Sequence, residues 1–183
     1  GLYVPVLCLG TATFGGTNGF EGWGHTQEEE ARRMINLCLD AGVNLFDTAD
    51  AYSDGLSETI LGKAVEGLRN KLLISTKATF NLNPEGRNAM GSSRFHLIEA
   101  CEASLKRLGT DYIDIGMIHM VDNKADFDAI FNGEIYRYVL ELKRKGVIRA
   151  IGLSSHISSI ALEAVNRGLI DVLMFSLNPA YDL

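Results

Sequence analysis

The feature that most constrains this chain is a regular alternation of short, almost continuously apolar runs with longer amphipathic segments. Runs of this kind are typical of strands that are covered on both faces, because neither side of such a strand meets water. Alternation of strands with helical segments favours a parallel sheet. We therefore predict six parallel strands, at Val6–Leu9, Val43–Asp47, Leu72–Thr76, Ile113–Ile118, Ile148–Leu153 and Val172–Leu177.

Five amphipathic segments between these runs are predicted to be helices. The first is expected to begin at Thr26, where Glu29 completes a capping-box pattern, and to end at Gly42. The others are expected to start near Ser57, to run from Ser92 or Ser93 to Gly109, from Gly133 to Lys145, and from Ser158 to Arg167. This order leaves two parallel architectures open, a doubly wound sheet and a (β/α)8 barrel.

Composition excludes several classes of protein. The 183 residues are enough for one domain, and the formal net charge of −6 does not provide the basic surface of a nucleic-acid binder. No apolar run reaches the roughly 18 residues of a membrane span, and we expect no membrane partner. Cys8, Cys38 and Cys101 show no CxxC spacing, which predicts neither a metal site nor a disulfide framework. We expect them to be small buried side chains of a cytoplasmic protein.

Polar or glycine residues stand where each predicted strand ends. In a parallel barrel these ends meet at one rim, which is where barrel enzymes place their chemistry. Taken singly, each residue has an ordinary structural interpretation, such as a turn cap, a solvated strand end or a satisfied histidine. Their common register makes a shared site the better interpretation. The residues are Gly10-Thr11, Asp47, Lys77, His119, Ser154-Ser155 and Asn178, with Tyr52 five residues after Asp47.

Four of these side chains, Asp47, Tyr52, Lys77 and His119, can together protonate a carbonyl oxygen. An unperturbed tyrosine has a pKa of about 10, and a neighbouring ammonium group favours the phenolate. A carboxylate holds the lysine in place, a histidine donates a hydrogen bond to the substrate oxygen, and the tyrosine acts as the general acid. None of these residues can supply a hydride, which would come from a nicotinamide.

With these residues in these positions, the chain resembles the aldo-keto reductase family. The matching segments cover essentially the whole chain: VLCLGTATFGG, AGVNLFDTADAYSDGLSETILGKAV, LLISTK, LIEACEASLKRLGTDYIDIGMIH and KRKGVIRAIGLSS. The resemblance implies a (β/α)8 TIM-type barrel, here truncated after about six β/α units, so that residues 1–183 form a single partial barrel domain. It implies an oxidoreductase that reduces an aldehyde or ketone with NADPH, or with NADH.

Carried over residue by residue, the resemblance implies Tyr52 as proton donor, Lys77 and Asp47 as the residues that orient it, and His119 as the group that positions the carbonyl. It also implies cofactor contacts at Gly10, Thr11, Asp47, Ser154, Ser155 and Asn178. The segments IGLSSHIS and MFSLNPAYDL resemble the branch of the family with an appended iron–sulfur domain. The cysteine clusters of such a domain are absent, so we predict no cluster in this chain.

A family barrel has eight strands, so a six-stranded sheet would expose its first and last strands. Unpaired strands invite association, and self-association through these edges is one expectation. Two alternatives to a working carbonyl reductase remain open. The chain could be a cofactor-binding, non-catalytic module, as in the potassium-channel beta subunits that resemble this family, or an inactive partial barrel of a longer reductase.

Overall fold

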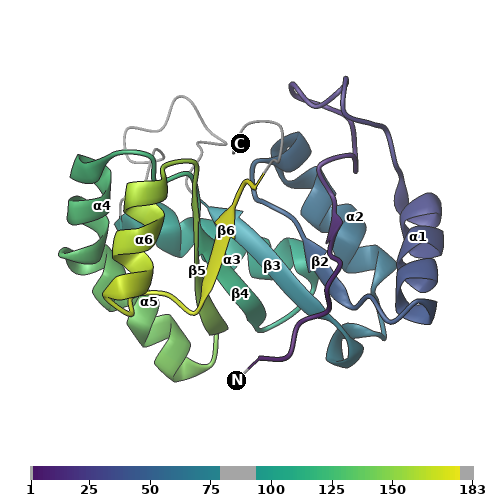
Figure 1. Ribbon diagram of the computed structural model, residues 1–183. Helices are drawn as coiled ribbons and strands as arrows, with labels where there is room; N and C mark the ends of the chain where they lie inside the picture. The colour runs from purple at the N-terminus through teal and green to yellow at the C-terminus, as the bar shows by residue number, and fades with distance from the viewer. Residues whose placement is uncertain (1, 79–93, 178–183) are drawn as a thin grey trace.

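A computed structural model describes residues 2–78 and 94–177 and confirms an α/β fold with a parallel sheet. The strands stand side by side in the order in which they occur along the chain, and the sheet curls into half of a barrel (Figure 1). The strands are β1 (Leu9–Gly10), β2 (Leu45–Asp47), β3 (Leu73–Ala78), β4 (Ile113–Ile118), β5 (Ile148–Ser155) and β6 (Val172–Phe175).

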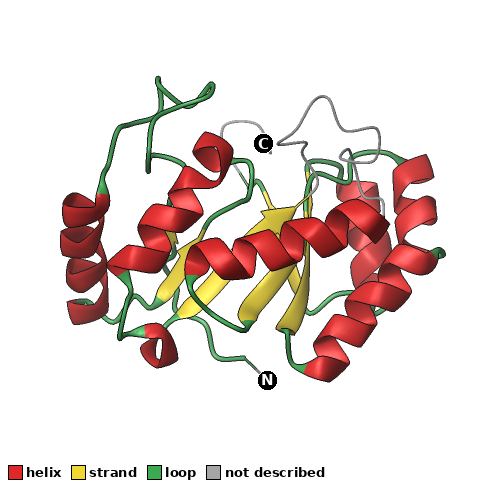
Figure 2. Ribbon diagram, turned by 180° about the vertical axis from the view of Figure 1, so that it is seen from behind, coloured by secondary structure: helices red, strands yellow, loops and turns green. Residues whose placement is uncertain are grey.

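Helices follow the strands along the chain and cover the outer face of the sheet, as seen from behind in Figure 2. They are α1 (Glu28–Asp40), α2 (Leu56–Ala64), α3 (Arg94–Leu108), α4 (Lys124–Phe131), α5 (Glu134–Lys145) and α6 (Ser158–Asn166). Two short 3-10 helices, η1 (Tyr52–Gly55) and η2 (Arg69–Lys71), lie within the connections. The alternation of strands and helices along the chain is the one that the apolar runs predicted.

The core lies in two layers on the two faces of the sheet. Between strands and helices, Ile35 and Leu61 pack with Phe46 and Ile74. On the other face a smaller cluster of Ile115, Met117 and Ala150 packs with Leu45 and Val172 of neighbouring strands. The second layer belongs to the interior of the half-barrel. Since both faces are apolar, the near-continuous hydrophobic runs of the strands have a direct physical cause.

Both edge strands are shorter than predicted, and β6 ends at Phe175. Val6 is fully exposed to solvent. The prediction that every cysteine is buried is wrong for Cys8, which is exposed, while Cys38 and Cys101 are half-buried. An edge strand has a neighbour on one side only, so half of its backbone groups gain nothing from pairing. An apolar sequence alone therefore does not extend an edge strand to its full predicted length.

Two helix predictions also need correction. The first helix begins at Glu28 with Gln27 as N-cap, and the capping box at Thr26 does not form. The Thr26 backbone instead donates a hydrogen bond to the carbonyl of Thr13. The helix α4 was not predicted, although Asn123 caps it by accepting a hydrogen bond from the backbone of Asp126.

Strand register brings the predicted polar residues to one edge. Gly10 pairs with Asp47 and Asp47 with Ser75, while Lys77 pairs with Met117 just before the end of β4. The carboxyl ends of the strands lie toward the top of Figure 1. No helix in the described part of the chain is long and apolar enough to cross a membrane.

Candidate active site

Lys77 is the centre of the polar cluster at the carboxyl edge of the sheet. Its Nζ lies 2.6 Å from Asp47 Oδ2, 2.7 Å from the carbonyl oxygen of Thr48 and 3.2 Å from Tyr52 Oη. The side chain is only 2% exposed. An ammonium group has three N–H donors, and these three contacts use all of them. Lys77 therefore points one donor at the tyrosine hydroxyl and cannot turn away without leaving a buried charge unpaired.

Asp47 is the anchor of this arrangement. Its Oδ2 pairs with Lys77, while its Oδ1 accepts a hydrogen bond of 2.9 Å from the hydroxyl of Ser75. Both carboxylate oxygens are thus engaged by neighbouring strand residues. This fixes the position of the carboxylate and, through it, that of the ammonium group.

Tyr52 reaches Lys77 because the chain turns sharply just after it. Ser53 and Asp54 both have left-handed backbones, with φ of 50° and 58°, and Gly55 follows with φ of 81°. A left-handed conformation is unfavourable for a residue other than glycine, and such residues cluster at functional sites. The Ser53 hydroxyl holds the turn by donating to the Phe14 carbonyl.

His119 lies directly after β4, beside the cluster. Burial, and after it the positive charge of Lys77, lower its pKa to about 4. The imidazole is therefore neutral near pH 7. A neutral imidazole carries one N–H, so it can donate a hydrogen bond to a substrate oxygen without adding a second cation beside Lys77.

The two first-strand positions differ from each other. Thr11 is fully buried, and its hydroxyl lies 2.8 Å from Ser57 Oγ and 3.2 Å from the Asp47 carbonyl oxygen. It ties the end of β1 to α2. Gly10 is exposed, and a Cβ added there would meet open space. Gly10 thus leaves room beside Asp47 at the rim.

The two serines at the end of β5, Ser154 and Ser155, also differ in the hydrogen bonds that they make. Ser154 Oγ accepts a hydrogen bond of 2.8 Å from the Met120 amide. As an acceptor there, Ser154 keeps its own hydroxyl hydrogen for another partner. Ser155 Oγ donates to the Val121 carbonyl at 2.8 Å and accepts from the Ile157 amide, so its hydroxyl is already satisfied within the protein. Of the two, Ser154 is better placed to contact a ligand.

Two predicted features lie outside the described residues. Asn178 follows the last described residue, and residues 79–93 between β3 and α3 are not described. The start of the third helix at Ser92 or Ser93 falls in the same interval. Their contribution to the site therefore stays a prediction.

An aromatic neighbour of Tyr52 was missed by sequence reasoning. The Phe20 ring centroid lies 5.4 Å from that of Tyr52, and the Trp23 ring centroid lies 6.0 Å from that of Phe20. Trp23 is 66% exposed. Both residues belong to the glycine-rich connection between β1 and α1. An isolated aromatic residue such as Phe20 in this loop carries no periodic signal, so only its place after a strand end could have pointed to the site.

Behind Lys77 lies a second set of buried polar groups. Glu58 accepts hydrogen bonds from the Thr76 hydroxyl and from Arg107 Nε, and it is fully buried. Asp50 is also fully buried, and neither of its Oδ atoms has a hydrogen-bond partner among the described residues. Burial and the charge of Glu58 raise the pKa of Asp50 to about 7. Asp50 is thus partly neutral at physiological pH.

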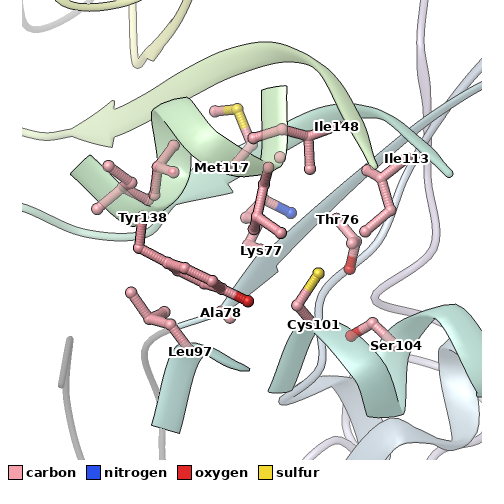
Figure 3. A pocket seen from close by; sticks show the side chains of 14 residues that line it. Thr76, Lys77, Ala78, Leu97, Cys101, Ser104, Ile113, Met117, Tyr138 and Ile148 are labelled. Atoms are coloured by element: carbon pink, nitrogen blue, oxygen red, sulfur yellow. The ribbon is translucent and has the colours of Figure 1, made fainter. Parts of the chain in front are cut away.

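A small apolar cavity of about 60 Å³ lies on the outer side of the same strands (Figure 3). Leu97 and Cys101 of α3 and Tyr138 of α5 surround it, together with Ile148 of β5. It is part of the layer between the sheet and the helices. The Tyr52 hydroxyl is not among the groups that line it, so this cavity is not the space in which a carbonyl substrate would meet Tyr52.

No group of three or more His, Cys, Asp or Glu side chains in the described ranges is arranged to hold a metal ion. The cluster at the carboxyl edge brings together a lysine, a tyrosine and a carboxylate, with a neutral histidine beside them. Such a set can deliver a proton and stabilise the anion that remains.

Comparison with known proteins gives the family. A family model described as "Aldo/keto reductase family" matches residues 6–179. The aldo-keto reductase YhdN of Bacillus subtilis is 34% identical over all of this chain and 52% of its own length. A Schizosaccharomyces pombe protein, described as a voltage-gated potassium channel beta subunit, is 37% identical over 71% of this chain and 37% of its own length. The chain spans about half the length of the first of these relatives, and less of the second.

Solved structures agree with the sequence comparison. The aldo-keto reductase AKR11C1 of Bacillus halodurans, in its holo form, superposes with a TM-score of 0.78 at 33% identity, over 96% of this chain and 54% of that one. An aldo/keto reductase of Klebsiella pneumoniae in complex with NADP and acetate superposes with a TM-score of 0.66 at 26% identity, over 87% of this chain and 48% of that one. The predicted fold, a TIM-type barrel truncated after six strands, is thereby confirmed.

Proposed function

Because the chain belongs to the aldo/keto reductase family, we propose that it reduces an aldehyde or ketone to the alcohol with NADPH as hydride donor. The observation that carries this proposal is the position of Lys77 Nζ, which lies within hydrogen-bond distance of both Asp47 and Tyr52. A tyrosine hydroxyl held against a buried ammonium is suited to give up its proton to a carbonyl oxygen.

Each residue of the cluster has a separate part in the proposed reaction. Tyr52 donates its proton to the carbonyl oxygen while the carbonyl carbon accepts a hydride, so that one proton and one hydride convert the carbonyl to an alcohol. Lys77 stabilises the phenolate that remains. The neutral imidazole of His119 donates a hydrogen bond that orients the substrate oxygen. When bound, a nicotinamide cofactor supplies the hydride.

The residues of the rim fit a nicotinamide. Gly10 leaves open space beside Asp47, and the Ser154 hydroxyl has a hydrogen with which to bind a carboxamide oxygen. We propose these two as cofactor contacts, while the engaged hydroxyls of Thr11 and Ser155 support them from behind. The Klebsiella pneumoniae relative with bound NADP supports a nicotinamide cofactor in general, with NADPH as the first choice and NADH as the second.

The substrate is proposed to be a small carbonyl compound with an apolar or aromatic side. Phe20 stands beside Tyr52, and Trp23 stands beside Phe20, so that both offer ring surfaces to such a group. Aromatic side chains bury large areas with few rotatable bonds, which makes them effective in ligand pockets.

The direct test is NADPH consumption with a panel of aldehydes by the full-length protein, beside its Tyr52→Phe variant. We expect turnover by the wild type and a loss of roughly 10²- to 10⁴-fold in the variant, since general acid catalysis contributes about this much. Equal rates for the two proteins would refute Tyr52 as the acid. NADH in a parallel series tests the choice of cofactor.

The beta-subunit relative supports a second candidate, a module that holds the cofactor but serves mainly as a protein partner. This candidate predicts one stable partner in a pull-down and no turnover with any carbonyl compound, whereas the reductase predicts turnover.

Residues 1–183 are proposed to be one partial barrel domain that turns over weakly or not at all by itself. The chain spans about half of its relatives, and the open edge at β6 leaves Leu173 and Met174 partly exposed. Self-association through such edges is a further proposal, tested by the oligomeric state of the isolated chain. Robust NADPH-dependent reduction by residues 1–183 alone would refute the first of these proposals.

The resemblance of the last third to the branch with an iron–sulfur domain stays a prediction. Iron content and visible absorbance of the full-length protein test it. A protein without iron would remove that branch from consideration while leaving the reductase proposal intact.

A further inference from the structure

Two segments at the rim are joined by a dense set of hydrogen bonds. One is the segment 119–122, which follows β4 and carries His119. The other is the segment 154–157, which ends β5 and carries Ser154. The Met120 amide donates to Ser154 Oγ at 2.8 Å, and the Val121 amide donates to the Ser154 carbonyl at 3.0 Å. The conformation of one segment therefore sets that of the other.

Met120 shows that this arrangement is held against a local preference. Its backbone is left-handed, with φ of 55°, although the residue is not glycine and its side chain is 41% exposed. Such a conformation persists only where the surroundings over-determine it. The geometry has a clear result, because it directs the Met120 amide at the Ser154 hydroxyl immediately after His119.

Asp122 and His156 close the far end of the two segments. Asp122 Oδ1 accepts a 2.7 Å hydrogen bond from the His156 backbone amide, and Asp122 Oδ2 lies 2.8 Å from His156 Nδ1. Burial alone would raise the pKa of Asp122, but the hydrogen bonds from the His156 amide and ring lower it below its usual range. The Asp122 carboxylate is consequently charged near neutral pH.

We propose that Asp122 and His156 are positioning residues that lock the 119–122 segment onto the end of β5 and so set the places of His119 and the Ser154 hydroxyl. This inference rests on the proposed function for its kinetic consequences, because His119 and Ser154 are the groups assigned there to the carbonyl and to the cofactor. The pair itself touches neither the substrate nor the nicotinamide in this assignment.

A purely structural role makes a different prediction. His156 is 56% exposed at its side chain and Asp122 31%, and half-exposed pairs contribute little to stability. If stability were the only purpose, removing the pair would change almost nothing. Positioning predicts a large kinetic effect without a matching loss of stability, since small displacements of catalytic groups are costly in rate.

The chain offers a matched control in the amino-terminal half of the same strand. Asp171 accepts a hydrogen bond from the Ile151 amide of β5 and pairs with Lys143, and both side chains are about as exposed as those of the rim pair. Asp171 thus makes the same two kinds of contact at Ile151, three residues before Ser154 on β5. Asp171→Ala removes an equivalent pair without touching the site.

The experiment compares Asp122→Ala, Asp122→Asn and Asp171→Ala in the full-length protein. We expect Asp122→Ala to lower kcat by roughly 10- to 100-fold and to raise the KM for NADPH, at nearly unchanged Tm. An asparagine can accept from the His156 amide and donate to its ring, so Asp122→Asn should recover most of the activity. Asp171→Ala should behave as wild type. Wild-type kinetics in Asp122→Ala would refute the proposal while leaving the reductase function in place.

Amide hydrogen exchange gives a readout that needs no activity. In Asp122→Ala we expect faster exchange at the Met120, Val121 and His156 amides, and no change there in Asp171→Ala. If the wild type reduces no carbonyl compound, the proposed function fails, yet exchange still decides whether the pair locks the segment. Unchanged exchange would refute the lock. If Asp122→Ala does not fold, His156→Ala and His156→Asn supply the same contrast, since an asparagine amide can take the place of the ring Nδ1.

Discussion

The two ends of the sheet carry clusters made from the same kinds of side chain, a carboxylate, a cation and a tyrosine, but the clusters differ in what they leave available. At the carboxyl end, Lys77 lies between Asp47 and the hydroxyl of Tyr52. Tyr52 is half-buried, and the rim is open beside Gly10. Here the cation is directed at a group that can exchange a proton.

At the amino end, Asp114 is fully buried near the start of β4 and pairs with Arg69 at 2.8 Å and Arg149 at 2.9 Å. It also accepts a hydrogen bond from the Ile74 amide of β3. The ring of Tyr112 lies between the two guanidinium groups, 3.8 Å and 4.1 Å from them. The cations contact the face of this ring.

The difference shows which part of the arrangement matters for chemistry. An arginine does not lose its proton in a protein, and it binds carboxylates and ring faces in a fixed geometry. A lysine pointed at a phenol oxygen stabilises the phenolate directly. We therefore interpret the Lys77 cluster as reactive and the Asp114 cluster as a structural tie between β3, β4 and β5.

The largest effect that separates the two clusters is expected from removing their cations. Lys77→Met should lower kcat/KM for a carbonyl substrate by roughly 10²- to 10⁴-fold, because Tyr52 loses the charge that stabilises its anion. Arg69→Met should lower stability and leave the kinetics of the folded protein almost unchanged. Steady-state kinetics with thermal unfolding checks both. A fall of similar size in kcat/KM for Arg69→Met would break the comparison.

The next effect concerns the carboxylate of the structural cluster. Asp114→Ala leaves two guanidinium groups and the Ile74 amide without their buried acceptor, and we expect a loss of about 3–5 kcal/mol in the free energy of unfolding. Denaturant titration of the full-length protein measures it. A change below about 1 kcal/mol would mean that the cluster behaves like an ordinary surface ion pair.

Asp50 sharpens the comparison, because it is buried like Asp114 but its oxygens have no hydrogen-bond partner among the described residues. Its folded-state pKa of about 7 lies above the ordinary value of 3.8. Because the pKa is raised on folding, the stability that the protonated Asp50 contributes to the fold is fully present below pH 3.8. That contribution is lost as the pH rises through 7.

Asp50→Asn mimics the protonated acid, so its stability should exceed that of the wild type at pH 8 and approach it at pH 4. Each unit of pKa shift corresponds to about 1.4 kcal/mol, which sets the scale of the gain. Unfolding of both proteins across this pH range is the measurement, with the exposed Asp54→Asn as control. The same offset at both ends of the range would count against a neutral Asp50.

The smallest effect lies within the structural cluster itself. Arg149 is half exposed and Arg69 is largely buried at their side chains. Because exposed ion pairs contribute little, Arg149→Ala should cost less than about 1 kcal/mol and Arg69→Ala clearly more. Comparison of their unfolding midpoints tests this order. The reverse order would mean that the exposed Arg149–Asp114 pair stabilises the fold more than the buried Arg69–Asp114 pair.

Much of this architecture could be predicted because the rules that govern it are periodic. Strands covered on both faces must be apolar, so a polar residue that follows one is conspicuous, and this found Asp47, Lys77 and His119. The family motif placed Tyr52. Sequence reasoning also found the order of strands and helices, because each buried strand requires a helix to cover it.

The remaining features could not be predicted, because they depend on contacts that leave no periodic pattern in the sequence. The left-handed turn at Ser53, the aromatic contact of Phe20 and the pairing of Asp122 with His156 each join residues that are distant in sequence or irregular in backbone. The capping box at Thr26 failed because its backbone pairs with Thr13 instead. The short helix α4 had one local signal, the asparagine cap at Asn123, which sequence reasoning did not use.

The central claim is that the carboxyl-end tyrosine transfers a proton and the amino-end tyrosine does not. The most direct measurement removes one oxygen atom at each end, by Tyr52→Phe and Tyr112→Phe, and follows NADPH oxidation by an aldehyde in the full-length protein together with its thermal unfolding. We predict that Tyr52→Phe lowers turnover by roughly 10²- to 10⁴-fold with little change in Tm, and that Tyr112→Phe keeps wild-type rates. Equal rates in the two variants would contradict the account.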